Sequence, residues 1–150
     1  MINNNVLDMI GNTPMIKLNN IGNSNIYVKL EKYNPAGSIK DRAVYYMVEN
    51  LEKNGLLKKG DVLVEATSGN TGIALSMIGS LKGYKVIIVM PETMSVERRT
   101  LMKAYGAKLI LTDGSLGMKG SIEMMNKLLS ENTNYISLKQ FENEYNPLAH

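Results

Sequence analysis

The sequence Glu65-Ala66-Thr67-Ser68-Gly69-Asn70-Thr71-Gly72 joins a short β-branched run to an apolar segment. The run before it is Val62-Leu63-Val64-Glu65, and residues 72–81 after it are apolar on nearly all sides. A strand that leads directly into a buried helix is half of a βα unit. The loop between them therefore lies beyond the carboxyl end of a strand, where open α/β sheets bind their ligands.

The same alternation of strands and helices extends along the chain. The predicted strands are residues 15–18, 26–30, 62–65, 86–89 and 108–111. The predicted helices are residues 39–51, 72–81, 96–105 and 118–129, and the first of them ends near Asn54-Gly55. We therefore predict an α/β fold with an open, mostly parallel sheet and flanking helices.

Composition excludes several classes of protein. Hydrophobic residues make up 44% of the 150 residues and charged residues 21%, which is typical of a soluble globular domain. The absence of cysteine excludes disulfides, a thiolate zinc site and a cysteine nucleophile in this chain, and we expect no metal site. The net charge of +3 is spread among interspersed charges, so it does not indicate nucleic-acid binding. We see no secretory signal and expect a cytoplasmic location.

The loop at residues 65–72 is a candidate anion site. Two glycines let the backbone approach a ligand, and Thr67, Ser68 and Thr71 offer hydroxyls at the start of a helix. A carboxylate or a phosphate would fit there. A hydroxyl-rich helix cap without a ligand is an equally good interpretation of these residues. The glycine spacing matches neither the dinucleotide fingerprint nor the Walker phosphate loop.

Lys40 is the second candidate, in the stretch Asn34-Pro35-Ala36-Gly37-Ser38-Ile39-Lys40-Asp41-Arg42. We expect Ser38 to cap a helix and Asp41, three positions later, to complete a capping box. Lys40 would then lie in the first turn, an electropositive setting that suits an amine able to form a Schiff base. Local physics alone favours a solvent-exposed lysine, because most lysines are exposed.

Four motifs occur in the order and spacing seen in one enzyme family. They are residues 11–14 (Gly-Asn-Thr-Pro), residues 34–42, residues 67–72 and residues 90–95 (Met-Pro-Glu-Thr-Met-Ser). This pattern resembles that of cysteine synthases, also called O-acetylserine sulfhydrylases, which are fold-type II pyridoxal-phosphate enzymes. The resemblance runs from about residue 7 to the end, and residues 90–99 resemble cysteine synthase more than its relative cystathionine β-synthase.

The resemblance implies a reaction and a set of roles. Lys40 would carry the pyridoxal 5'-phosphate and move the proton at the substrate α-carbon, and Asn70 would lie beside the 3-oxygen of the cofactor ring. The substrate-binding positions would be Thr67, Ser68, Asn70, Thr71 and Gln140, which match those that hold the amino-acid substrate by its α-carboxylate. The implied reaction is a β-replacement that makes L-cysteine and acetate from O-acetyl-L-serine and sulfide. Enzymes similar to this chain form homodimers and can bind the carboxyl-terminal tail of serine acetyltransferase.

The resemblance also implies a division of the chain, because members of this family are about twice as long. Residues 1–35 would pack with a large domain that follows residue 150, residues 36–145 would form the small mobile domain, and residues 146–150 would begin the return. We expect that residues 1–150 alone neither hold the cofactor nor turn over substrate. The sequence departs from the family pattern at Ala66, where proline is common, and at Glu144 and Tyr145.

The sequence leaves two other functions open. A homologue could act on cysteine, releasing hydrogen sulfide and forming lanthionine or serine, and the altered residues Glu144 and Tyr145 are the hint for it. A non-catalytic module that binds a partner is the alternative from another class. The presence of Lys40 argues against a pure binding role, because binding a peptide tail needs no Schiff base.

Overall fold

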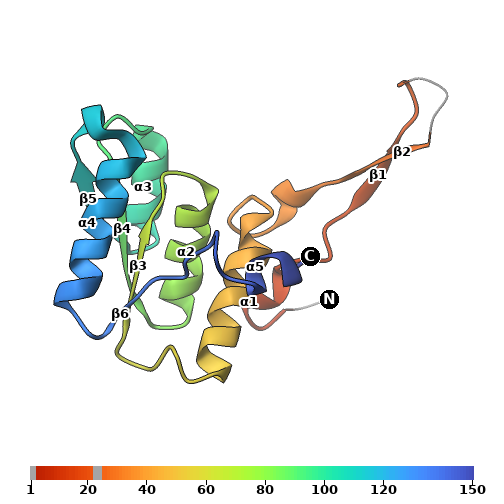
Figure 1. Ribbon diagram of the computed structural model, residues 1–150. Coiled ribbons are helices and arrows are strands. Elements are labelled where there is room, and N and C mark those ends of the chain that lie inside the picture. The colour runs from red at the N-terminus through yellow and green to blue at the C-terminus, as the bar shows by residue number, and fades with distance from the viewer. Residues whose placement is uncertain (1–2, 22–24) are drawn as a thin grey trace.

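The predicted parallel sheet is confirmed in the computed structural model, which describes residues 3–21 and 25–150 (Figure 1). Its strands are β3 (Val62–Ala66), β4 (Lys85–Pro91), β5 (Lys108–Thr112) and β6 (Tyr135–Ile136), all parallel and in the order β5-β4-β3-β6. The helices are α1 (Lys40–Lys53), α2 (Asn70–Leu81), α3 (Val96–Ala104), α4 (Gly117–Glu131) and the short α5 (Tyr145–Leu148). Strand β6 and helix α5 have too few residues for a periodic pattern and are absent from the prediction.

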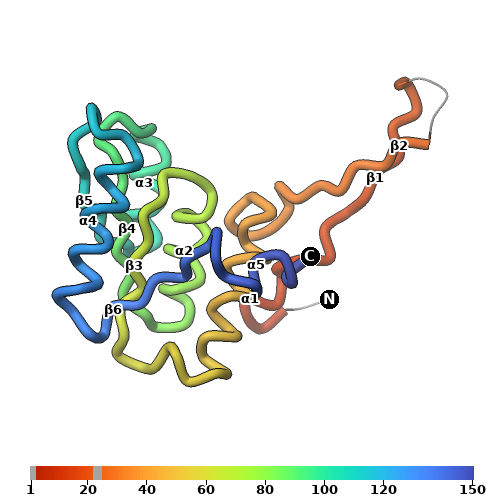
Figure 2. The backbone as a smooth tube through the Cα atoms, in the orientation of Figure 1, coloured from red at the N-terminus to blue at the C-terminus, as the bar shows by residue number. Residues whose placement is uncertain are grey.

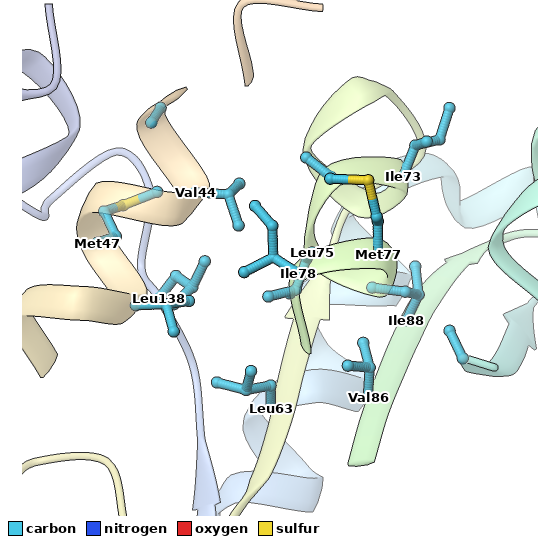
Figure 3. Packing of buried hydrophobic residues seen from close by; sticks show 14 of the residues in the cluster. Val44, Met47, Leu63, Ile73, Leu75, Met77, Ile78, Val86, Ile88 and Leu138 are labelled. Atoms are coloured by element: carbon cyan, nitrogen blue, oxygen red, sulfur yellow. The ribbon is translucent and has the colours of Figure 1, made fainter. Parts of the chain in front are cut away.

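The two faces of the sheet bury alternating side chains of its central strands. Val62 and Val64 of β3 pack with the apolar face of α4, whereas Leu63 lies on the opposite face with α2. Figure 3 shows Leu63, Val86 and Ile88 of the strands beside the side chains of α2, with α1 beyond them. Period-two alternation in a strand thus divides the core into two layers. Helix α4 covers one layer, and α2 with α1 and α3 covers the other.

Helix α2 is enclosed on nearly all sides, as its sequence predicts. Every residue from Thr71 to Gly79 is buried, because the sheet contacts one side of the helix and α1 contacts another. Helix α1 is amphipathic by contrast and buries one stripe. It ends where predicted: Gly55 has φ +69, and the N–H groups of Leu56 and Leu57 both donate to the carbonyl of Leu51.

A hairpin of two antiparallel strands, β1 (Met15–Leu18) and β2 (Ile26–Lys29), extends away from this body (Figure 2). Its apolar side chains are largely uncovered, since Met15 is 60% exposed and Tyr27 is 58% exposed. The segment before it returns to the core: the 3-10 helix η1 (Val6–Met9) buries Leu7 in the same cluster as α1. Among the residues described, no helix combines the length and the apolar character needed to cross a membrane.

We expect Gly79→Ala to destabilise the intact protein, although alanine is the better helix former by about 1 kcal/mol. A Cβ at position 79 would collide with Cγ2 of Val86, because α2 lies close to β4 at this point. Overpacking of a core costs about 1–3 kcal/mol, so the free energy of unfolding in denaturant should fall.

The matched control is Ser80→Ala on the exposed side of the same helix, which we expect to be close to neutral. In a Val86→Ala background the colliding atom is gone, and Gly79→Ala should then raise the free energy of unfolding. A rise in the background that retains Val86 would contradict the close approach of α2 to β4.

Candidate functional site

The loop between β3 and α2 leaves two of its hydroxyls, those of Thr67 and Ser68, available to a ligand. The N–H of Thr67 donates to the carbonyl of Val89 at 3.1 Å, which holds the start of the loop to the sheet. Helix α2 begins at Asn70, and the capping position is Gly69, with no hydrogen bond from a side chain to the first turn. Within the described chain, the side chains of Thr67, Ser68 and Asn70 make no hydrogen bond. The interpretation of these hydroxyls as a cap therefore lacks the contacts that a cap requires.

Gln140 reaches the same loop from a distant part of the sequence. The hydroxyl of Thr71 donates to Oε1 of Gln140 at 2.7 Å, and both side chains are buried. Because this hydroxyl engages the amide oxygen, the Nε2 group of Gln140 keeps its two donors for a ligand. The amide of Asn146 holds the backbone behind it, donating to the carbonyl of Gln140 at 2.7 Å. Folding thus joins Gln140 to the loop through a hydrogen bond.

Lys40 is the first residue of α1, and its side chain is half-buried. Figure 1 shows α1 and α2 running in the same direction, so both begin at the end of the body toward which β3 points. Lys40 and the loop at residues 67–72 therefore lie toward the same end of the molecule. In the part of the chain that the structure describes, no hydrogen bond joins the Lys40 side chain to that loop.

The predicted capping box before Lys40 is wrong in its detail. Ser38 Oγ accepts the N–H of Lys40 at 3.1 Å, and the residue at the capping position is Ile39. The carboxylate of Asp41 reaches past Ser38 and accepts the N–H of Ala36 at 2.6 Å. A turn brings this N–H over the start of the helix. That turn carries Gly37, whose N–H donates to the carbonyl of Asn34 at 2.8 Å.

Asp41 is fully buried, which the sequence pattern did not predict. Its Oδ2 holds the loop, whereas its Oδ1 has no hydrogen-bond partner among residues 3–21 and 25–150. Burial raises the pKa of the Asp41 carboxyl, and hydrogen bonds from backbone N–H groups oppose this shift. A buried acid therefore fixes the loop from inside, directly beside Lys40.

Glu31 is a second residue that the motifs did not identify. Arg42 donates to it with two nitrogens, from Nε at 2.8 Å and from Nη2 at 3.0 Å. The carboxylate also accepts the Thr13 hydroxyl at 2.6 Å and the Asn34 amide at 2.9 Å. The Arg42 guanidinium is the main reason that the pKa of Glu31 is lowered to about 2. This cluster joins the motif at residues 11–14 to the loop before Lys40.

Tyr145, one of the residues that depart from the family pattern, lies in the short helix α5. Tyr145 packs against α1, where its ring meets Tyr46 edge to face and its hydroxyl accepts the amide of Asn54 at 2.9 Å. Its neighbour Asn146 is the residue that contacts the backbone of Gln140. The altered side chain at position 145 therefore supports α1.

Comparison with known proteins gives consistent matches along the whole chain. The family model described as pyridoxal-phosphate dependent enzyme matches residues 6–150. A cysteine synthase of Flavobacterium sp. is 52% identical over 148 residues, which are 97% of this chain and 48% of that protein. The chain spans about half the length of the curated relatives it matches.

Solved structures give the same picture. The crystal structure of a cysteine synthase from Entamoeba histolytica matches with a TM-score of 0.96 at 47% identity, covering 100% of this chain and 47% of that one. A hydrogen sulfide-producing enzyme from Fusobacterium nucleatum matches with a TM-score of 0.94 at 52% identity, covering 100% of this chain and 50% of that one.

The Glu31 cluster gives a pH-dependent prediction. The folded-state pKa of Glu31, about 2, lies below the ordinary value of 4.5, so its contribution to stability is present above pH 4.5 and is lost as the pH falls toward 2. We expect Glu31→Gln to lower the melting temperature of the intact protein at pH 7. The difference from wild type should shrink steadily as the pH falls from about 4.5 toward 2, because the unfolded protein takes up a proton at Glu31 in this range before the folded protein does.

Thermal unfolding at several pH values measures this difference. Glu131→Gln is the control, since Glu131 lies on α4 in an exposed pair with Lys127, and such pairs contribute little. A difference for Glu31→Gln that stays constant from pH 7 to pH 2 would contradict the assignment.

Proposed function

We propose that this chain, which belongs to the pyridoxal-phosphate dependent enzyme family, carries the reactive lysine and the carboxylate site of a cysteine synthase. The observation that carries the proposal is the hydrogen bond between Thr71 and Gln140. This bond places the amide Nε2 group of Gln140 beside a loop that is itself rich in donors. Among the described residues, the hydroxyls of Thr67 and Ser68 in that loop have no partner. Such a site suits the α-carboxylate of an amino acid. The names of the relatives, all about twice as long, favour cysteine synthesis.

The residues described fit the cofactor of this family. When bound, pyridoxal phosphate supplies an electron sink for the bonds that break at the substrate α-carbon. Lys40 offers a primary amine for its aldehyde, and this side chain is half-buried at the start of α1. Asn70 is exposed at the start of α2, where its amide can donate to the oxygen on the cofactor ring.

The proposed work of this chain is orientation and proton transfer. Thr67, Ser68 and the Nε2 group of Gln140 hold the substrate carboxylate, and Thr71 holds Gln140 in place. A fixed carboxylate leaves the α-carbon in one orientation, so that the Lys40 amine can take its proton and return it. Acetate then leaves O-acetyl-L-serine and sulfide takes its place. The product is L-cysteine, and the chain contributes no cysteine of its own.

The test uses the intact protein with O-acetyl-L-serine and sulfide, and separately with cysteine alone. We expect cysteine formation to be the faster reaction, and Lys40→Ala to lower its kcat by about 1000-fold, within the range for loss of a general acid or base. Lys53→Ala is the control, because Lys53 is exposed at the other end of α1.

Two outcomes would overturn the proposal. Faster release of sulfide from cysteine would assign the activity named for the Fusobacterium nucleatum structure. Full biological activity after Lys40→Ala would instead favour a partner-binding module. The homodimer and the serine acetyltransferase tail stay predictions of the sequence resemblance, and the cytoplasmic location stays a prediction from the sequence itself.

We also propose that the hairpin of β1 and β2 packs against a carboxyl-terminal domain in the intact protein. Its uncovered apolar side chains support this packing, together with the greater length of the relatives. In this division residues 36–145 form the small domain, and residues 146–150 begin the return of the chain to the carboxyl-terminal domain. Leu7 belongs to the core of the small domain, so the amino-terminal segment contacts both parts.

Amide hydrogen exchange tests the packing of the hairpin. Residues 15–18 and 26–29 should exchange at least about tenfold more slowly in the intact protein than in residues 1–150 alone, because covered strands open less often. Residues 62–66 serve as the internal control, since β3 is buried in this chain by itself. Equal exchange of the hairpin in the two proteins would refute the packing.

A further inference from the structure

Glu65 is a buried carboxylate to which the proposed reaction gives no role. It lies in β3 with 4% of its surface exposed, and its strand neighbours Leu63 and Val64 are fully buried apolar residues. Placing a carboxylate in a sheet interior is costly unless donors surround it. An apolar residue such as valine would suit the strand better than a carboxylate. The hydrogen-bond donors around Glu65 therefore indicate which part of the structure the carboxylate holds.

These donors come from the turn that carries Gln140. The Ser137 hydroxyl donates to Oε2 of Glu65 at 2.9 Å, and the N–H of Leu138 donates to the same oxygen at 3.0 Å. Burial raises the pKa of the Glu65 carboxyl, and these hydrogen bonds oppose the shift. The carboxylate thus attaches one particular turn, at residues 137–140, to the end of the central strand.

The backbone of this turn is strained immediately before Gln140. Lys139 has φ +49, a left-handed conformation that side chains other than glycine, asparagine and aspartate rarely adopt. Its N–H donates to Ser137 Oγ at 3.1 Å, and that same hydroxyl donates to Glu65. The hydrogen bonds to Glu65 therefore hold the turn that directs Gln140 toward Thr71.

We propose that Glu65 is a positioning residue for the substrate carboxylate, acting through the turn at residues 137–140. Strand β3 leads directly into Thr67 and Ser68, and Glu65 fixes Gln140 to the same strand end. One strand thereby sets the spacing between the two sides of the carboxylate site. The inference rests on the proposed function, because it assigns Glu65 to the site that binds the amino-acid substrate.

The test compares Glu65→Ala, Glu65→Gln and Glu52→Ala in the intact, cofactor-loaded protein. Glu52 is a matched control: its carboxylate accepts Lys82 at 2.8 Å and Tyr84 at 2.8 Å, on α1 and outside the carboxylate site. We expect Glu65→Ala to raise the KM for O-acetyl-L-serine about tenfold or more, with kcat within about threefold and the KM for sulfide unchanged, the pattern of lost ground-state binding.

Two further variants sharpen the result. Glu65→Gln keeps an oxygen that can accept both hydrogen bonds, so it should restore the KM to within about threefold of wild type. Ser137→Ala removes one donor but keeps the Glu65 side chain, so it leaves no cavity in the place of the buried acid. It should raise the KM for O-acetyl-L-serine by a smaller factor than Glu65→Ala. If Glu65→Ala does not fold, these two variants decide: an unchanged KM in Ser137→Ala overturns the proposal.

A merely structural role predicts a different result. Glu65→Ala would then lower the melting temperature as Glu52→Ala does and leave the KM for O-acetyl-L-serine within twofold of wild type, which overturns the proposal. Hydrogen exchange of residues 137–142 provides a readout without turnover. It should accelerate about tenfold in Glu65→Ala and stay unchanged in Glu52→Ala.

This readout separates the two proposals. If the wild-type protein makes no cysteine, the proposed function fails, whereas faster exchange of residues 137–142 in Glu65→Ala still supports the link from Glu65 to the turn. Unchanged exchange in that variant overturns the positioning role whatever the substrate.

Discussion

Strand β3 pairs in parallel with β4 on one side and with β6 on the other, and this pairing sets the positions of both parts of the candidate site. The register places Val64 opposite Ile87 and Val62 opposite Tyr135, so β3 is the strand that joins the two halves of the sheet. Its side chains enter both layers of the core, and its carboxyl end leads into the loop at residues 67–72. Any shift in this register would move the loop and the turn at residues 137–140 relative to each other.

Much of the fold could be predicted from local patterns. The β-branched runs at residues 86–89 and 108–111 became strands, and the apolar segment at residues 72–81 became the enclosed helix α2. These elements carry a periodicity that a short window reveals. Strand β6 could not be predicted in this way, because two residues have no period and their pairing with β3 depends on the arrangement of the whole sheet.

The residues of the candidate site also fall into two groups, those in continuous motifs and those whose partners are distant in the sequence. Lys40 and the loop hydroxyls belong to continuous motifs, so the sequence alone made them candidates. Glu31, Asp41 and Glu65 are important because they are shielded from solvent and because folding brings their partners to them. The sequence does not single them out, since most acidic residues lie on the protein surface. The partners of Glu65 lie 72 and 73 residues away, beyond the reach of any spacing rule.

The hydrogen bond between Thr71 and Gln140 can form only late in the synthesis of the chain. Its partners are 69 residues apart, so it closes a long loop at a considerable cost in chain entropy. Translation at about 5–20 residues per second separates the synthesis of the two side chains by several seconds. A nascent chain therefore exposes Lys40 and the loop at residues 67–72 before β6 is available to pair with β3. The proposed carboxylate site is completed late, when β6 joins the sheet beside β3.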